Sequence, residues 1–196
     1  ADMGVKRIEF IDDIFNVKEK DFVEFFNRVI KDNLGVSFFF PTALKGDLLN
    51  KEVIDTMMQG GAVGVNVSLE SASSRMQKVM RKNLNIEKFR DNLDYICKEY
   101  PSAVTTLNTM HGFPTETEEE AQMTLDFIFS MKWVHFPYTH IVRIFPGTDL
   151  EKFALEHGVN KGAINDAIDK SYHEVAPTLP FKKEFTDQYK LKFLKE

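Results

Sequence analysis

Apolar strand-like segments and amphipathic helix-like segments alternate along most of this 196-residue chain, and the alternation limits the folds open to it. β-Branched and aromatic residues crowd five short segments, each followed by apolar residues at helical spacing. The strand segments are residues 5–11, 36–40, 62–69, 103–110 and 138–145. Alternating strands and helices build a parallel sheet covered by helices, so the sequence predicts the α/β class.

The same pattern sets the expected helices and domains. Helices are expected at residues 18–34, after Asn50, and at 71–82, 86–100, 118–131 and 149–157. Pro41 should end the second strand. No G-x-G-x-x-G follows the first strand, so an open, curved barrel fits better than a dinucleotide-binding sheet. We expect this partial barrel over residues 1–158 and a helical extension over residues 159–196, with Ile164, Ala167, Ile168 and Tyr172 on one face.

Residues 103–120 carry the strongest local signal: a strand, a Gly-Pro turn and a doubly marked helix start. Thr115 with Glu118, and Thr117 with Glu120, both fit the capping-box pattern. Carboxylates at positions 116, 118, 119 and 120 suit the positive end of a helix dipole. A strand that turns into a helix in this way is a βα loop, and such loops carry the active sites of α/β barrels. A well-capped structural helix explains the same spacing equally well.

Four motifs together resemble the radical S-adenosylmethionine (SAM) superfamily. Residues 64–82 resemble its G-(I/L/V)-E-S-x-S…M-x-K segment, and residues 112–119 resemble G-F-P-x-E-T-x-E. Residues 145–150 resemble P-G-T-x-L, and residues 8–15 resemble the F-x-D-D-x-F of the B12-associated branch. The motifs occur in the family's order over residues 6–158.

The resemblance implies a partial barrel of six β/α units, of which this chain shows five. The first unit of the family carries C-x-x-x-C-x-x-C, whose thiolates hold a [4Fe–4S] cluster. This chain contains only Cys97, on the inward face of a helix, where a small buried side chain is expected. The chain alone is therefore expected to be inactive. It is either a fragment of a larger enzyme, which we favour, or a natural protein that has lost the chemistry.

In the intact enzyme, the resemblance implies reductive cleavage of SAM at the cluster for radical chemistry, with an electron donor of the flavodoxin or ferredoxin type. The Asp-Asp motif favours the B12-associated branch, whose members methylate or rearrange unactivated carbons, with cobalamin held by another domain. Methylthiolation of tRNA is the alternative within the family. A non-catalytic nucleotide-binding barrel stays open, as does a metal hydrolase built from Asp12, Glu70 and His111.

Further residues match SAM-binding positions of the family. Glu70 matches a carboxylate that accepts hydrogen bonds from ribose, and Lys82 matches a cation that pairs with the methionine carboxylate. Asn108 matches a polar position that contacts ribose. The backbone of Ile144 and the ring of Phe145 would flank adenine. Asp12 or Asp13 stands where many members bind the SAM amino group, although only one of these adjacent side chains can face the interior.

Two residues are candidates for work on the substrate. His111 follows the strand at 103–110 and could act as an acid or base, although a buried structural histidine is the more frequent case. Arg143 lies in an apolar strand and is either an anion-binding group or a rim residue. The substrate, a small molecule or a peptide, cannot be read from the sequence.

Composition limits the partners. The net charge is −5, the pI is near 5.6 and the basic residues are scattered, which argues against a nucleic-acid face. No signal peptide or membrane-spanning apolar run is visible. A single cysteine fits a reducing, cytoplasmic setting. If the first unit is missing, the strand at 5–11 is an exposed edge, so self-association is expected there.

Overall fold

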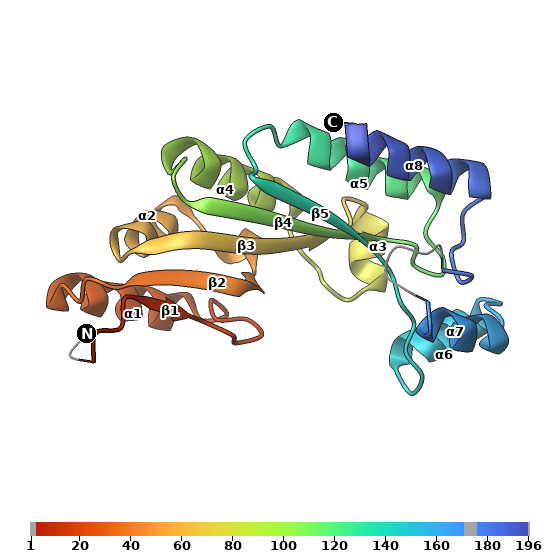
Figure 1. Ribbon diagram of the computed structural model, residues 1–196, viewed down its shortest axis with the longest axis horizontal. Helices are drawn as coiled ribbons and strands as arrows, with labels where there is room; N and C mark the ends of the chain where they lie inside the picture. Colours follow the sequence, from red (N-terminus) through yellow and green to blue (C-terminus); the bar gives the residue numbers. More distant parts are fainter. Residues whose placement is uncertain (1–2, 171–175, 196) are drawn as a thin grey trace. The chain divides into compact units, whose positions relative to one another are not determined.

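A five-stranded sheet in the order β1-β2-β3-β4-β5 organises the chain, as Figure 1 shows. The computed structural model describes residues 3–170 and 176–195. The strands are β1 (Arg7–Glu9), β2 (Ser37–Leu44), β3 (Ala62–Glu70), β4 (Val104–His111) and β5 (Phe136–Ile141). β2 pairs with β1 and with β3 in parallel. The predicted α/β class with a parallel sheet is confirmed.

The chain forms two compact units, and β3, β4 and β5 each contribute residues to both. Unit 1 comprises Ala1–Leu69, Asn83–Asn108 and Met131–Tyr138. Unit 2 comprises Glu70–Lys82, Thr109–Ser130 and Thr139–Glu196.

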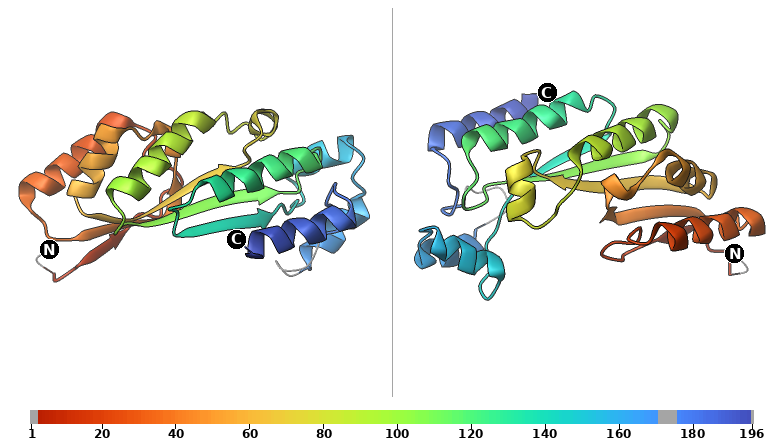
Figure 2. Two further views of the ribbon diagram at one scale, coloured as in Figure 1. Left: turned by 90° about the horizontal axis from the view of Figure 1, so that it is seen from above. Right: turned by 180° about the vertical axis from the view of Figure 1, so that it is seen from behind.

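Three helices cover one face of the strands in unit 1 (Figure 2): α1 (Glu19–Asp32), α2 (Lys51–Gln59) and α4 (Ile86–Glu99). A short 3-10 helix, η1 (Gly46–Leu48), follows β2. Apolar side chains at helical spacing give each helix a buried stripe, such as Phe22, Phe26 and Val29 on α1. The predicted cap of α2 is present, because Asn50 Oδ1 accepts a hydrogen bond from Val53 N at 3.0 Å.

The expectation that Pro41 ends the second strand is wrong. β2 continues through Pro41 to Leu44. Its register against β3 shifts between Phe40 and Leu44, so the proline lies at an irregularity in the pairing. A proline has no N–H to donate, and a bulge is where a sheet tolerates that loss.

Unit 2 contains the remaining helices: α3 (Ser74–Val79), α5 (Glu118–Ser130), α6 (Asp149–Glu156), α7 (Lys161–Ile168) and α8 (Lys183–Lys195). α3 is shorter than the expected helix at 71–82 because Ser73 caps it, its Oγ accepting from Met76 N at 3.2 Å. α7 buries Ile164 and Ala167 as expected, whereas Tyr172 lies outside the described residues. None of the described helices is both long and apolar enough to cross a membrane.

β1 is the end strand of the sheet order, and its exposed Ile8 lies between Arg7 and Glu9. This three-residue strand has a single apolar residue between two charged ones. It is a weak edge, because short charged edges oppose pairing with another sheet. We therefore expect association of residues 1–196 only at high protein concentration, and Ile8→Lys should remove it. Sedimentation across a wide concentration range measures this. A monomer at every concentration would contradict the expectation.

Candidate functional site

Glu70 and Lys82 form an ion pair at the carboxyl end of β3, where α/β proteins place their chemistry. Lys82 Nζ lies 2.7 Å from Glu70 Oε1, and the two side chains are 34% and 17% exposed, respectively. Glu70 has a left-handed backbone with φ of 64°, as does Arg81, with φ of 56°, just before Lys82. Such conformations cost energy in residues other than glycine and cluster at functional sites. The structure thus joins two side chains that the sequence assigned to the same ligand.

A cavity of about 430 Å³ in unit 2 opens beside this ion pair. Its apolar lining comes from Met80, Met110, Phe113, Leu150 and Phe153, among others. The charged lining comes from Glu70, Arg81, Lys82 and Asp149. A mostly apolar cavity of this volume with a few charged groups is typical of a site for a small molecule or cofactor.

Met110, on β4, lines one wall of the cavity. The loop after β4 continues this wall through Phe113. Gly112 within it has φ of +91°, and a Cβ there would lie 2.2 Å from Leu179 Cδ2. The backbone conformation favours glycine, and a larger residue would also displace the end of the Leu179 side chain.

Glu116 binds the backbone of the same loop. Its Oε2 accepts hydrogen bonds from Gly112 N at 2.6 Å and from Phe113 N at 3.2 Å. The side chain is buried, its Oε1 has no hydrogen-bond partner among the described residues, and burial raises its pKa to about 7. The sequence suggested only that Glu116 complements the helix dipole. Its spacing from Gly112 could have indicated this role in the turn.

One of the two expected capping boxes is present. Thr117 N donates to Glu120 Oε2 at 3.1 Å, and Glu120 N donates to Thr117 Oγ1 at 3.3 Å. The box of Thr115 with Glu118 is not formed, because Thr115 accepts hydrogen bonds from Arg75 and Glu118 accepts one from Lys182 N. The hydrogen bond from Arg75 is the largest contribution that lowers the pKa of Glu120 to about 2.

His111 is buried in unit 2 rather than open to the cavity. Its Nδ1 lies 3.1 Å from Thr139 Oγ1, and its ring lies 4.5 Å from that of Tyr189 on α8. Burial lowers the pKa of His111 to about 4, so the imidazole is neutral at neutral pH. This position matches the structural role that the sequence analysis weighed against catalysis.

Asn108, in unit 1, belongs to a chain of amides across three strands. Asn108 Nδ2 donates to Asn66 Oδ1 at 2.6 Å, and Asn66 Nδ2 donates to Pro41 O at 2.7 Å. The sequence analysis missed Asn66, although a polar residue in an apolar strand needs a partner. The irregular pairing at Pro41 provides the carbonyl that Asn66 binds.

The other candidate residues lie elsewhere. In unit 1, Asp12 and Asp13 are exposed in the loop after β1. The expectation that Arg143 lies in a strand is wrong, because β5 ends at Ile141. In unit 2, Arg143 Nη1 donates to Ala167 O at 2.8 Å, and Phe145 is exposed. The Ile144 side chain packs with Ala154 and Ile164, which leaves its backbone for any contact with a ligand.

The donor groups of this chain do not fit an iron–sulfur cluster, because Cys97 is its only cysteine. Cys97 is buried on α4, and burial raises the pKa of its thiol. Within residues 3–170 and 176–195, no three His, Cys, Asp or Glu side chains are placed to hold a metal ion. The hydrolase built from Asp12, Glu70 and His111 therefore gains no support.

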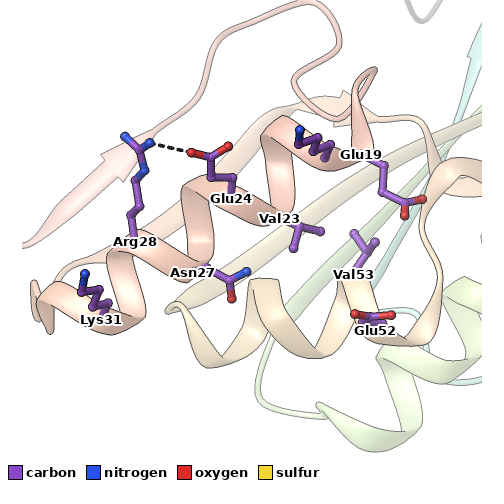
Figure 3. Close-up of a pocket in the computed structure, with 9 residues that line it drawn as sticks. Glu19, Val23, Glu24, Asn27, Arg28, Lys31, Glu52 and Val53 are labelled. Atoms are coloured by element: carbon purple, nitrogen blue, oxygen red, sulfur yellow. Dashed lines mark hydrogen bonds and ion pairs between the residues drawn. The ribbon is translucent and has the colours of Figure 1, made fainter.

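A second depression, of about 570 Å³, lies between α1 and α2 in unit 1 (Figure 3). It is lined mainly by charged side chains, with Val23 and Val53 as its apolar members. Arg28 Nη2 and Glu24 Oε1 pair along α1 at 2.5 Å. The groups that line it do not converge on a common point, so we place the functional site at the cavity beside Glu70.

A parallel α/β sheet with a cavity at the carboxyl end of a strand is the arrangement that barrel-type enzymes use for small-molecule sites. The sequence pattern of the radical SAM superfamily matches residues 3–128. The chain therefore belongs to the radical SAM superfamily.

Two relatives match most of this chain. An uncharacterized methyltransferase of Pyrococcus horikoshii is 28% identical over 156 residues, which cover 80% of this chain and 33% of that protein. The threonylcarbamoyladenosine tRNA methylthiotransferase of Bacillus subtilis is 24% identical over 176 residues, covering 89% and 38%. The chain thus spans between 33% and 38% of the length of these relatives.

The fold resembles two solved radical SAM structures. One is the methyltransferase TsrM of Kitasatospora setae with cobalamin and a [4Fe–4S] cluster bound. It shares 16% identity with a TM-score of 0.67, covering 83% of this chain and 32% of that one. The other is coproporphyrinogen III oxidase of Escherichia coli, with 13% identity, a TM-score of 0.51 and coverage of 88% and 35%.

Proposed function

We propose that this chain is the SAM-binding part of a radical SAM enzyme that methylates or rearranges an unactivated carbon of its substrate. The observation that carries the proposal is the Glu70–Lys82 ion pair in the wall of a 430 Å³ cavity. Both residues lie in the segment that resembles the SAM-binding motif of the family.

SAM fits the donor groups of the cavity. The Lys82 ammonium has three N–H donors, of which one reaches Glu70, so it can also pair with the methionine carboxylate. The Glu70 carboxylate can accept hydrogen bonds from ribose hydroxyls. Met110 and Phe113 provide apolar walls that exclude water. SAM would supply the methyl group or, after reductive cleavage, the carbon radical that the family uses.

The proposal assigns no electron transfer to this chain, because its cysteine content does not fit the cluster. A cluster-bearing segment and an electron donor of the flavodoxin or ferredoxin type would belong to the complete enzyme. Cobalamin, if used, would be held by another domain. The Asp12-Asp13 motif and the likeness to a cobalamin-bound methyltransferase support the B12-associated branch.

Methylthiolation of tRNA is the second candidate function. A tRNA methylthiotransferase matches 89% of this chain, which supports it. The net charge of −5 opposes it, because binding of a phosphate backbone needs clustered positive charge. Mass spectrometry of tRNA nucleosides from cells with and without the gene separates the two. Loss of a methylthio nucleoside would support the second function and contradict methyl transfer to another substrate.

We expect Lys82→Ala and Glu70→Ala each to weaken SAM binding about 5- to 150-fold, which corresponds to ~1–3 kcal/mol for a lost hydrogen bond. Binding by the parent chain should be no tighter than millimolar, since few protein contacts oppose the cost of ordering the ligand. The NMR chemical shifts of ¹³C-labelled methionine methyl groups measure this affinity. Met80 and Met110 line the cavity and should shift with SAM, whereas the buried Met57 of unit 1 should not.

The matched control is Lys98→Ala, which removes an exposed lysine paired with Asp94 in unit 1. SAM should shift the Met80 and Met110 methyl signals less in Lys82→Ala and Glu70→Ala than in the parent chain. If the SAM-induced shifts are the same in all three proteins at every SAM concentration, the assignment of the site is wrong.

A further inference from the structure

The loop that follows Glu70 is fastened to the start of α5 by a compact set of hydrogen bonds, all within unit 2. Ser73 Oγ donates to Glu120 Oε1 at 2.7 Å. Arg75 Nε donates to the same oxygen at 2.8 Å, and Arg75 Nη2 donates to Glu120 Oε2 at 2.5 Å. A guanidinium that binds both oxygens of a carboxylate fixes orientation as well as distance.

Further contacts of the same two segments reinforce this connection. Arg75 Nη2 also donates to Thr115 O at 2.6 Å. Ala72 N donates to Thr124 Oγ1 at 3.0 Å, and the hydroxyl oxygens of Ser71 and Thr124 lie 3.3 Å apart. The Glu120 side chain is 12% exposed and that of Arg75 48%, so water screens the carboxylate less than the guanidinium.

The connected segments form two of the walls of the cavity, whereas α6 contributes Asp149, Leu150 and Phe153. Glu70, Arg81 and Lys82 lie at either end of the α3 segment, to which Ser73 and Arg75 belong. Phe113 lies in the loop that leads to Glu120 on α5. Neither Arg75 nor Glu120 lines the cavity, so any effect of either on a bound molecule must pass through these walls.

We infer that Arg75 and Glu120 are positioning residues, which hold the α3 segment so that the Lys82 ammonium and the Glu70 carboxylate face one bound molecule together. The inference rests on the proposed function, because it names SAM as that molecule. α3 contributes only six helical residues, too few to be stable alone. Its placement therefore depends on the contacts made at its start.

The test is a titration of the Arg75→Met variant with SAM. Binding is monitored through the ¹³C chemical shifts of the Met80 and Met110 methyl groups. We expect about tenfold weaker binding, as for residues coupled through a shared network. Arg75→Lys should recover part of the loss, because it restores the charge without the two-point contact. The matched control is Arg28→Met, which breaks the exposed Arg28–Glu24 pair of unit 1 (Figure 3), also at 2.5 Å.

A double substitution separates positioning from general stability. If Arg75 acts through Lys82, then Arg75→Met in the Lys82→Ala background should change SAM affinity less than about twofold. An equal loss in both backgrounds would mean that Arg75 only stabilises the unit, which overturns the inference. Unchanged affinity in Arg75→Met, with weakened binding in Lys82→Ala, also overturns it but leaves the proposed function standing. No effect of Lys82→Ala would count against the proposed function itself.

A second variant covers the case in which Arg75→Met does not fold, judged by the methyl signal of the buried Met76. Glu120→Gln keeps the shape of the side chain and removes its charge. It should weaken SAM binding in the parent background and have no further effect beside Lys82→Ala. Full SAM affinity in a folded Glu120→Gln variant would overturn the inference.

Discussion

Residues 1–196, mixed with SAM and a strong reductant, should release no 5′-deoxyadenosine. A cluster that reduces SAM needs several thiolates, and this chain offers one, buried on α4. The groups left to hold SAM are few, and each contributes about 1–3 kcal/mol. Chromatography of the reaction mixture measures the product. Release of 5′-deoxyadenosine above the level of reductant alone would contradict the expectation.

Joining a cluster-bearing segment with C-x-x-x-C-x-x-C to residues 1–196 should restore iron binding, visible absorbance and cleavage of SAM. The control is the same fusion with its three added cysteines replaced by alanine, which should lose all three properties. In the active fusion, Glu70→Ala and Lys82→Ala should weaken SAM binding and leave the cluster absorbance unchanged. Loss of the cluster in these variants would place Glu70 or Lys82 in its support instead.

Stability should change with pH in opposite directions at Glu116 and His111. Burial raises the pKa of Glu116 from its ordinary value of 4.5 to about 7, so the folded state binds the proton more tightly and loses stability as the pH rises through this range. Burial lowers the pKa of His111 from 6.5 to about 4, so stability is lost as the pH falls through that range. Each effect amounts to about 3 kcal/mol, and they offset one another between pH 4.5 and 6.5.

Glu116→Gln should remove one of these effects and expose the other. The amide oxygen can still accept from Gly112 N and Phe113 N, but the side chain no longer titrates. We expect the free energy of unfolding of the variant, relative to the parent, to rise by about 3 kcal/mol between pH 4.5 and 8. Urea unfolding followed at the Met76 methyl group, which packs with Phe113, measures it.

The control for this series is Glu156→Gln, which neutralises an exposed carboxylate of the same unit. Its stability relative to the parent should be the same at pH 4.5 and 8. A Glu116→Gln curve parallel to the parent curve would show that Glu116 has the same pKa in the folded and the unfolded protein.

The elements of the fold were predictable because their signals are local. The stripe of Phe22, Phe26 and Val29 marks α1, and Asn50 caps α2 where the sequence placed it. The predicted strand end at Pro41 was wrong, because the rule that proline interrupts strands is local and does not account for a shift in pairing between two strands. The helix at 71–82 was overestimated because Ser71 and Ser73 use their hydroxyls in contacts with α5 that spacing along the chain does not show.

The site was predictable only where a motif marked it. Glu70 and Lys82 are predicted ligand groups because they match the family's motif, and the structure adds that they pair with each other. Arg75 and Glu120 lay beyond prediction because the pair is separated by 45 positions, and no periodicity links them. Glu116 was visible as an acid, but its burial depends on how the loop after β4 closes over it.

The hydrogen bonds that link Pro41 O, Asn66 and Asn108 fix which atom of each side-chain amide donates and which accepts. A backbone carbonyl only accepts hydrogen bonds, so Pro41 obliges Asn66 to donate with Nδ2, and Asn66 in turn obliges Asn108 to donate. The Asn108 side chain cannot rotate by a half turn without losing a partner, which leaves its oxygen facing away from Asn66. No member of the chain ionises, so Asn108 presents the same hydrogen-bonding polarity in acid and in base.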